Sequence, residues 1–420
     1  MRLRLLILFC VFSLQGLAQN YSYTSVSNDL FENGGVEIYG EGGINSTTFT
    51  GSFFAGLLDG RHYDNQTLRS ITDRAGATNR LGFDTHTGFS TAFKLNKKNN
   101  DNLLFTLSAG FKTHFNSSYS ADALDVFLKG NAAFAGREAQ FDNLHATYLE
   151  YSQVKAGLHK KTASGQRFGV AIGLNLGRSM FTIDSPFARM YTHSIGNALR
   201  FNVLAEADYT SHSGESASGI NGIGAGLDFY FEQEINLSGD PKNKGFLRFE
   251  VQDFGFITFN QNTKNTVMDT LYFYRGSDVG TFPNRRGEEI ALLDIGDARD
   301  LATKTASNVS KTVWLPFWLR VRGYQDFDSF DVTAGTDFRV NAGFAPYVFT
   351  HVRKHIGKAW KAGIITGAGG YGTGNLGFSL HFENAGWALG IISQNVEGVV
   401  FSNSAGGLHG GISIQKRFSK

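Results

Sequence analysis

Hydrophobic and polar residues alternate along most of the chain. Between residues 83 and 114, Phe89, Phe93, Phe105 and Leu107 fall on odd positions, whereas polar residues such as Lys112 fall on even positions. A period of two predicts β-strands with one apolar and one polar face. The pattern recurs at 168–176, 199–209, 223–231 and 376–382. These runs approach the about 9 to 11 residues that a tilted strand needs to cross a bilayer.

The connections between these runs also alternate in length. Short polar turns such as NKKNND, KTASGQ and HIGKA stand between longer stretches at about 57–82, 116–143, 179–195 and 280–311. Transmembrane barrels have short turns on the periplasmic side and long loops outside. The pattern predicts an all-β fold, a transmembrane antiparallel β-barrel of about 14 strands within a range of about 12 to 16.

Two segments have helix-like spacing instead. They are SADALDVFLKGN at 120–131 and GEEIALLDIGDARDLA at 287–302. Their apolar residues recur as on one face of a helix. We expect both to form short helices in loops or in the lumen, with Gly130 and Asn131 ending the first.

Composition supports the barrel over a soluble β-sandwich or propeller. The chain has 51 Gly, 38 Phe and only 5 Pro, with a mean hydropathy of -0.18. An aromatic and aliphatic face on every strand would leave a soluble monomer with too large an exposed apolar patch. We therefore predict that this face meets lipid and that the small and polar face lines the lumen. The residues predicted to face lipid are Phe89, Phe93, Phe105, Leu107, Phe201, Leu227 and Phe229.

The first 18 residues are typical of a secretory signal peptide. Arg2 and Arg4 precede an apolar run that ends in small residues, which suits cleavage after Ala18. A permanent transmembrane helix is the alternative, but the apolar run is too short to span about 30 Å. Translocation by this signal and the barrel pattern predict an outer-membrane location. The predicted organisation is a signal peptide at 1–18, an N-terminal segment near the lumen at 19–46 and the barrel at 47–420.

Cysteine and charge exclude several classes of function. Cys10 is the only cysteine, so the mature chain would have no disulfide, thiolate metal site or cysteine nucleophile. Without Arg2 and Arg4 the basic and acidic residues are equal in number. Nothing resembles the basic patches with aromatics that bind nucleic acid, and we expect no nucleic-acid partner.

Charged residues on the polar face of three consecutive strands are the candidate functional residues. Because consecutive strands pair as hairpins, opposite charges on them can meet across the ladder. The network would act either in selectivity and gating or as a salt-bridged plug that holds a closed barrel together. Its balance of signs favours the plug. The residues are Arg200, Glu206, Asp208, Asp228, Glu232, Arg248 and Glu250.

The sequence around the candidate enzyme and cofactor motifs does not support those functions. GAGGYG at 367–372 fits a dinucleotide pattern but is followed by a strand rather than a helix. His351 and His355 are four apart on a strand, about 13 Å at ~3.3 Å per residue, too far for one metal. No GxSxG motif is present. We predict no enzymatic activity, no catalytic residue, no metal and no cofactor.

The C-terminal run GISIQKRFSK has Ile412, Ile414 and Phe418 in one register. Outer-membrane chains often end on such an aromatic, which lets the barrel assembly machinery recognise the final strand. We predict that Phe418 is this assembly signal, although Ser419 and Lys420 follow it.

Several segments resemble an uncharacterised family of outer-membrane barrels from Bacteroidota, a domain-of-unknown-function family. They include ADALDVFLKGNAAFAG, VQDFGFITFNQNT, YFYRGSDV, TVWLPFWLRVRGY and GNLGFSLHF. The family looks distantly similar to fatty-acid-transporter-type barrels and to accessory barrels of the type IX secretion system. The resemblance implies about fourteen strands and carries over no catalytic residue. We expect outer-membrane lipid as surroundings and hypothesise an accessory barrel with a protein partner in a surface or secretion complex. A passive channel for a small hydrophobic ligand is the alternative.

Overall fold

The structure of the 420-residue chain is a computed structural model. The structure describes residues 34–60, 63, 65–95, 103–196, 198–210, 219–236, 239–240, 243–275, 306–403 and 405–418. The predicted signal peptide at 1–18 and the predicted helix at 287–302 lie outside these residues.

The described chain consists mainly of β-strands. The strands are β1(Gly35–Ser46), β2(Asn79–Lys94), β3(Leu103–Tyr119), β4(Glu138–Gln140), β5(Leu144–Lys161), β6(Arg167–Thr192), β7(Ala198–Thr210), β8(Gly222–Ile235), β9(Gly245–Arg275), β10(Ser307–Trp314), β11(Phe317–Phe327), β12(Phe330–Val340), β13(Ala345–Ile356), β14(Trp360–Gly370), β15(Gly374–Asn384), β16(Trp387–Ser393) and β17(Leu408–Arg417). The helices are α3(Gly51–Asp59), α4(Asn65–Thr72), α5(Ala121–Lys129), the 3₁₀ helix η1(Asn131–Phe134) and α7(Glu397–Val400).

These strands occupy fourteen positions in one closed antiparallel barrel. Three positions hold two strands end to end: β4 precedes β5 alongside β6, β7 precedes β8 between β6 and β9, and β10 precedes β11 alongside β9. The barrel closes because β1 pairs with β17 as well as with β2. The predicted all-β antiparallel barrel of about fourteen strands is confirmed.

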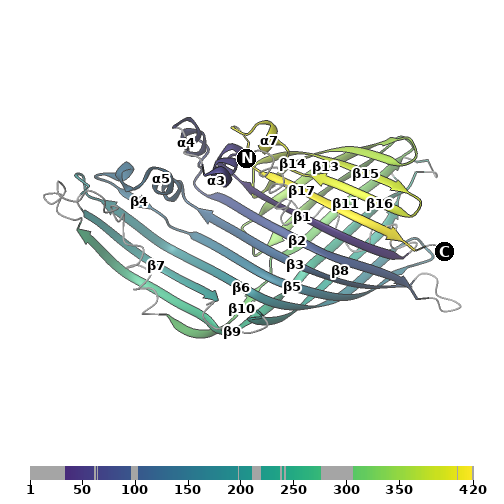
Figure 1. Ribbon diagram of the computed structural model, residues 1–420, viewed down its shortest axis with the longest axis horizontal. Coiled ribbons are helices and arrows are strands. Elements are labelled where there is room, and N and C mark those ends of the chain that lie inside the picture. The colour runs from purple at the N-terminus through teal and green to yellow at the C-terminus, as the bar shows by residue number, and fades with distance from the viewer. Residues whose placement is uncertain are drawn as a thin grey trace.

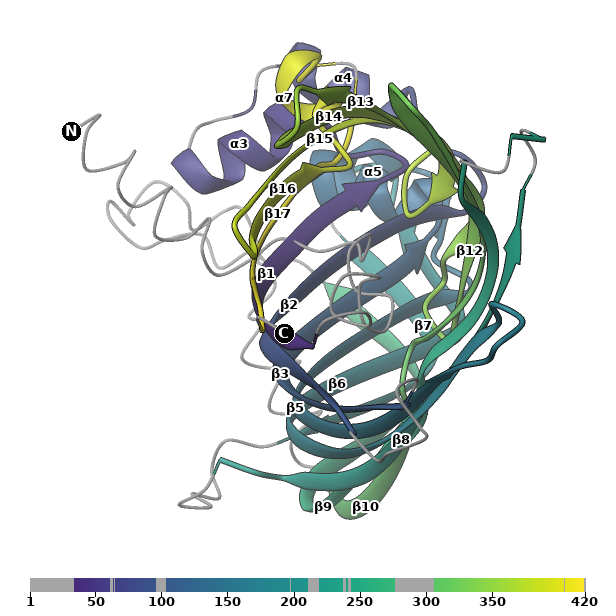
Figure 2. The ribbon, with the colours of Figure 1, turned by 90° about the vertical axis from the view of Figure 1, so that its right-hand side faces the viewer.

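The two ends of the barrel differ. One end, the turn end, has short connections such as Asp328–Ser329 between β11 and β12. The other, the loop end, carries α3, α4, α5 and α7 in its connections (Figures 1 and 2). The loop-end parts of β6 and β9, together with β7, extend beyond the rest of the wall at this end (Figure 1). Long strands therefore extend the barrel unevenly.

Side chains alternate between the inner and outer faces of the wall as predicted. On β8, Leu227 and Phe229 are exposed outside, whereas Tyr230 and Glu232 are buried inside. The predicted lipid-facing residues that lie exposed on the outer wall are Phe89, Phe93, Leu107, Leu227 and Phe229. Phe105 is half-buried on the same face, opposite Phe93 in the ladder.

Phe201 requires a correction. It is half-buried on β7 and packs against Phe141, with a ring separation of 6.2 Å, and beside the buried Phe134 and Met190. The prediction that Phe201 faces lipid is wrong because residues of the β3–β5 connection cover this part of the wall. Alternation alone could not show that the chain folds back over its own strand.

The start of the barrel also requires a correction. Residues 35–46, predicted to be an N-terminal segment near the lumen, form the wall strand β1 and pair with β17 from Gly35↔Arg417 to Ile44↔Leu408. The barrel therefore begins at Gly35 and not at residue 47. The glycines of this stretch hid its strand character, because Gly40 and Gly42 interrupt the outward apolar positions.

Helices α3, α4 and α5 pack on the outside of the wall at the loop end. Phe53 of α3, Ile71 of α4 and Leu124 of α5 share a hydrophobic cluster with Tyr119 and Leu81, which point outward by alternation. Helix α5 confirms the expectation for 120–131, and Gly130 caps it with φ 74°. None of the helices in the described ranges is long and apolar enough to cross a membrane.

Candidate functional site

A cluster of four charged side chains, three buried and one half-buried, lies in the barrel lumen, and we call it the lumenal charge cluster. Asp253 of β9 accepts hydrogen bonds from Lys112 of β3 (2.7 and 2.8 Å) and from Lys155 of β5 (2.8 Å). Lys155 also donates to Asp228 of β8 at 2.5 Å. The two lysines and two aspartates balance, so neither sign is left uncompensated in a low-dielectric interior.

A β-bulge brings Asp253 into this cluster. The β8–β9 register shifts between Leu227↔Phe254 and Phe229↔Val251, which adds one residue to β9. Asp253 has φ 65°, in the left-handed region that Asp tolerates better than most residues. Its own amide donates to Asp228 at 2.7 Å, which fixes the bulge.

Inward glycines make room for the long side chains. An added Cβ on Gly173 of β6 would lie 3.0 Å from Lys155 Cγ. Gly224 and Gly226 of β8 face the same interior. The polar face is therefore rich in glycine because the lumen is packed with side chains.

Further charges continue the cluster across the lumen. Arg339 of β12 makes a bidentate contact with Asp84 of β2, and His114 Nδ1 lies 2.7 Å from the same carboxylate. On the neighbouring strand β11, Arg322 donates to Asp337 at 2.8 Å. The guanidinium groups of Arg320 and Arg339 lie 4.5 and 4.6 Å from the Trp318 ring centre. Strands from around the barrel thus meet in its interior.

The predicted charge network is only partly one network. Glu232 and Arg248 pair across the β8–β9 ladder at 3.4 Å, as expected for hairpin neighbours. Asp228 belongs to the lumenal charge cluster, and Glu250 lies opposite Arg320 in the β9–β11 ladder. All four of the predicted residues on β8 and β9 therefore lie inside the barrel.

The three predicted residues on β7 do not join them. Asp208 contacts Lys311 at 2.6 Å, Glu206 contacts the same lysine at 3.4 Å, and Arg200 lies 3.8 Å from Glu138. The prediction of one continuous network is wrong for these residues. The physical reason is that β7 stands end to end with β8 between β6 and β9, rather than beside it.

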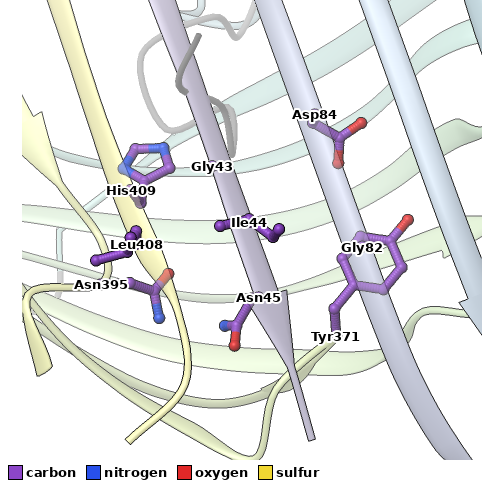
Figure 3. A pocket seen from close by; sticks show the side chains of 9 residues that line it. All are labelled: Gly43, Ile44, Asn45, Gly82, Asp84, Tyr371, Asn395, Leu408 and His409. Atoms are coloured by element: carbon purple, nitrogen blue, oxygen red, sulfur yellow. The ribbon is translucent and has the colours of Figure 1, made fainter. Parts of the chain in front are cut away.

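A small pocket lies at the loop end of the lumen, between β1, β2 and β17 (Figure 3). Gly43, Asn45 and Gly82 line it together with Tyr371 of the β14–β15 turn. Tyr371 is buried and its ring lies against Gly82, where an added Cβ would come within 2.0 Å of the ring. A second pocket beside Asp253 has room for about one water molecule. Around both pockets, side chains of the described residues therefore occupy the lumen.

Gly82→Ala should destabilise the barrel by about 1–3 kcal/mol, because the new methyl group overpacks the site of Tyr371. The measurement is the urea midpoint of the refolded barrel. Tyr371→Ala in the same chain removes the clash, so the two changes together should cost less than their sum. Additive costs would show that the ring does not lie against Gly82.

A charged cluster near the turn end has the spacing of a cation site. Asp326, Asp331 and His355 place ligand atoms within 4.8 Å of one another. Asp331, however, already contacts Arg353 at 2.6 Å and Lys361 at 3.3 Å. The Asp331 carboxylate is already paired with these two side chains, so the cluster has the geometry of an ion-pair group rather than a metal site. His351 instead lies 2.7 Å from Ser379, away from His355.

The joint between β1 and β2 is held mainly by side chains. The backbone ladder has only two pairs, Asn45↔Gly82 and Ser46↔Leu81. Below them the Tyr39 hydroxyl contacts His86 Nε2 at 3.0 Å. Near the turn end, Thr91 Oγ1 donates to the Gly35 carbonyl at 3.1 Å. The sequence signalled none of these contacts.

Loops at the loop end join this region to the C-terminal strands. Gly51 of α3 and Gly398 of α7 approach so closely that a Cβ on Gly51 would lie 1.8 Å from the Gly398 carbonyl oxygen. Glu397 of α7 accepts from Asn395 at 2.6 Å and from the Leu376 amide at 3.0 Å. Burial raises the pKa of the Glu397 carboxyl. These contacts hold α7 between the β1–β2 connection and β15.

Phe418 ends the described chain beside the barrel closure. Its ring stacks on Phe93 with a separation of 5.9 Å, and its amide donates to the Gly34 carbonyl at 3.2 Å. This residue therefore helps to join β17 to the first strands. Its role in assembly stays a prediction.

A closed fourteen-strand barrel with an apolar outer wall and a charge-filled interior defines a transmembrane β-barrel of the outer-membrane type. The chain belongs to a family of unknown function, DUF5723, whose model matches residues 36–389. No curated protein matches the sequence.

Among solved structures, the chain is similar to the toluene transporter TodX of Pseudomonas putida, with a TM-score of 0.41 and 7% identity over 97% of this chain and 96% of that one. It is also similar to the translocator domain of the autotransporter NalP from Neisseria meningitidis, with a TM-score of 0.34 and 9% identity over 100% and 95% of the two chains. These values are too low to support an argument about function.

Proposed function

We propose that the protein is a non-enzymatic barrel of the outer membrane that is closed to solutes and serves as a structural or accessory subunit of a surface or secretion assembly. The observation that carries this proposal is the filled lumen, in which Lys112, Lys155, Asp228 and Asp253 from four different strands satisfy one another.

Two physical arguments support a closed barrel. First, an ion-selective pore presents a ring of one sign, whereas this cluster is balanced and paired. Second, an apolar solute crossing the lumen would have to separate buried ion pairs, which costs several kcal/mol. The filled lumen therefore favours the accessory role over a passive channel for a small hydrophobic ligand.

The purified barrel should conduct little in a planar bilayer. Replacing all four residues of the lumenal charge cluster with alanine removes equal numbers of both signs and should raise the conductance severalfold, because water can enter the emptied space. The matched control is Arg189→Ala with Glu138→Ala, an ion pair at the loop end, which should leave the conductance unchanged. Folding of each variant is checked by its gel shift on boiling.

Purification in mild detergent with mass spectrometry tests the accessory role. A protein partner recovered in a fixed ratio with the closed barrel is the expected result. A native barrel that conducts or takes up a hydrophobic solute, with no partner recovered, would reject the proposal in favour of the channel.

A further inference from the structure

The helices α3, α4, α5 and α7 lie together at the loop end, and we call them the helical collar. Helices α3, α4 and α5 share a hydrophobic cluster with Leu81 of β2 and Leu408 of β17, which point outward by alternation. Helix α7 adjoins α3, because the Ser52 amide donates to the Ser402 carbonyl at 2.8 Å. Figure 2 shows α3 outside the curve formed by β16 and β17. The helical collar therefore covers part of the outer face of the wall, the face that meets lipid elsewhere.

The helical collar lies at one boundary of the apolar band on the outer wall. On β17, the outward residues Ile412 and Ile414 are exposed, whereas Leu408 at the loop end packs partly buried against the helices. The 10 residues of β17 span ~33 Å at ~3.3 Å per residue. At a strand tilt of ~40° this length crosses ~25 Å, the height of the apolar band of such barrels. Because long loops lie on the outside, the helices on Leu408 are at the level of the outer-leaflet interface.

Large apolar side chains of the helical collar are exposed. Leu57 of α3 is 65% exposed and Phe127 of α5 is 71% exposed. Val399 and Val400 of α7 are 69% and 64% exposed. Polar side chains such as Arg69 of α4 are exposed on the same collar. Helices that combine apolar and polar surfaces lie in a membrane interface with the apolar side inserted by about 5–10 Å.

The wall next to the helical collar identifies lipid as the neighbour of these side chains. Helix α7 follows β16 and precedes β17, and Ile391 and Ile412 of these strands are exposed on the outer wall. The outward positions of β17 from Leu408 to Ile414 carry no charge. The apolar outer wall therefore continues up to the helical collar. Since this wall contacts hydrocarbon, the apolar groups at its upper boundary are within reach of the same lipid layer.

We propose that the helical collar is a membrane-binding surface that lies in the outer-leaflet interface. Leu57, Phe127, Val399 and Val400 insert among the acyl chains next to the lipid headgroups, and Arg69 stays at the headgroup level. The collar thereby fixes the depth of the barrel in the bilayer on the side of β17, β1 and β2. This inference goes beyond the proposed accessory function, because it holds whether the lumen is closed or open.

The experiment uses single introduced cysteines, since Cys10 in the predicted signal peptide is the only cysteine of the chain. Leu57→Cys and Val400→Cys each carry a nitroxide spin label on the mature barrel refolded into phosphatidylcholine vesicles. Power saturation compares the access of oxygen, which concentrates in hydrocarbon, with that of a nickel chelate, which stays in water. The matched control is Ile195→Cys, at an exposed apolar residue in the β6–β7 turn of the loop end. The ratio of oxygen to nickel access should be at least about threefold higher at Leu57 and Val400 than at Ile195.

Two results would overturn the proposal in barrels that still shift on boiling. Nickel access at Leu57 and Val400 equal to that at Ile195 would place the helical collar in water. Low access of both reagents would mean that protein, such as a second copy of the chain, covers the collar instead of lipid. Ile412→Cys on the outer wall is the hydrocarbon reference, and a low oxygen-to-nickel ratio there would reject the lipid-facing wall together with the collar. The conductance measurement reports on the accessory function separately.

Discussion

Asp253→Ala should destabilise the barrel by about 3–5 kcal/mol, the cost of leaving buried charges without their partner. Asp253 accepts three hydrogen bonds from Lys112 and Lys155, so its removal takes away the carboxylate that Lys112 contacts and leaves Lys155 paired with Asp228. The measurement is the free energy of unfolding in urea of barrel refolded into lipid vesicles. A fall in the temperature at which the gel shift is lost should accompany it.

Two further variants make this result specific. Asp328→Ala changes an exposed aspartate in the β11–β12 turn and should cost about 0–1 kcal/mol. Adding Lys112→Met to Asp253→Ala removes one uncompensated cation and should recover part of the stability. If Asp253→Ala were no more costly than Asp328→Ala, the four charges would not form a buried cluster in the membrane-embedded protein.

Leu227→Arg should cost about 2–4 kcal/mol if the residue lies near the bilayer midplane. Leu227 is exposed on the outer wall near the middle of β8, next to the inward Asp228. The cost arises because the arginine replaces an apolar group that contacts hydrocarbon. It is measured as the difference in unfolding free energy between the variant and the native barrel in vesicles.

The control for this prediction is Ile195→Arg, at an exposed position in the β6–β7 turn of the loop end. Ile195 lies outside the band that strands span, so we expect a change within about 0.5 kcal/mol. Equal costs at both positions would contradict the assignment of the outer face to lipid. Gly226 is unsuitable as a lumen control, because its inward space is occupied near Asn175.

Alternation predicted the fold because it is a local property of the chain. The inward position of Lys112 and the outward positions of Phe89 and Leu227 follow from parity within single strands. The helix at 121–129 was also visible, since Ser120 caps its start and Gly130 its end. Whether a residue is at an odd or an even position shows which face of the sheet it lies on, wherever one face is polar and the other apolar.

The candidate site was less visible because it depends on contacts between distant strands. Lys112 and Asp253 are 141 residues apart, and the bulge that aims Asp253 inward shows in the sequence only as a change of the apolar positions from odd to even numbers between Val251 and Phe254. Arg200 was grouped with Asp228 because consecutive strands were assumed to be neighbours. Because β7 and β8 lie end to end, their side chains are not cross-strand neighbours. No pattern within either strand shows this arrangement.

The uneven joints of β1 change how the sheet should be divided. β1 pairs with β17 over ten residues but with β2 over only two. Backbone pairing therefore holds β1 mainly to β17, the last strand of the chain, rather than to β2, the next strand. The true ends of the sheet are β1 and β2, which the loop of α3 and α4 joins covalently. We expect local separation of the barrel wall to begin between β1 and β2, one strand away from the β1–β17 pair.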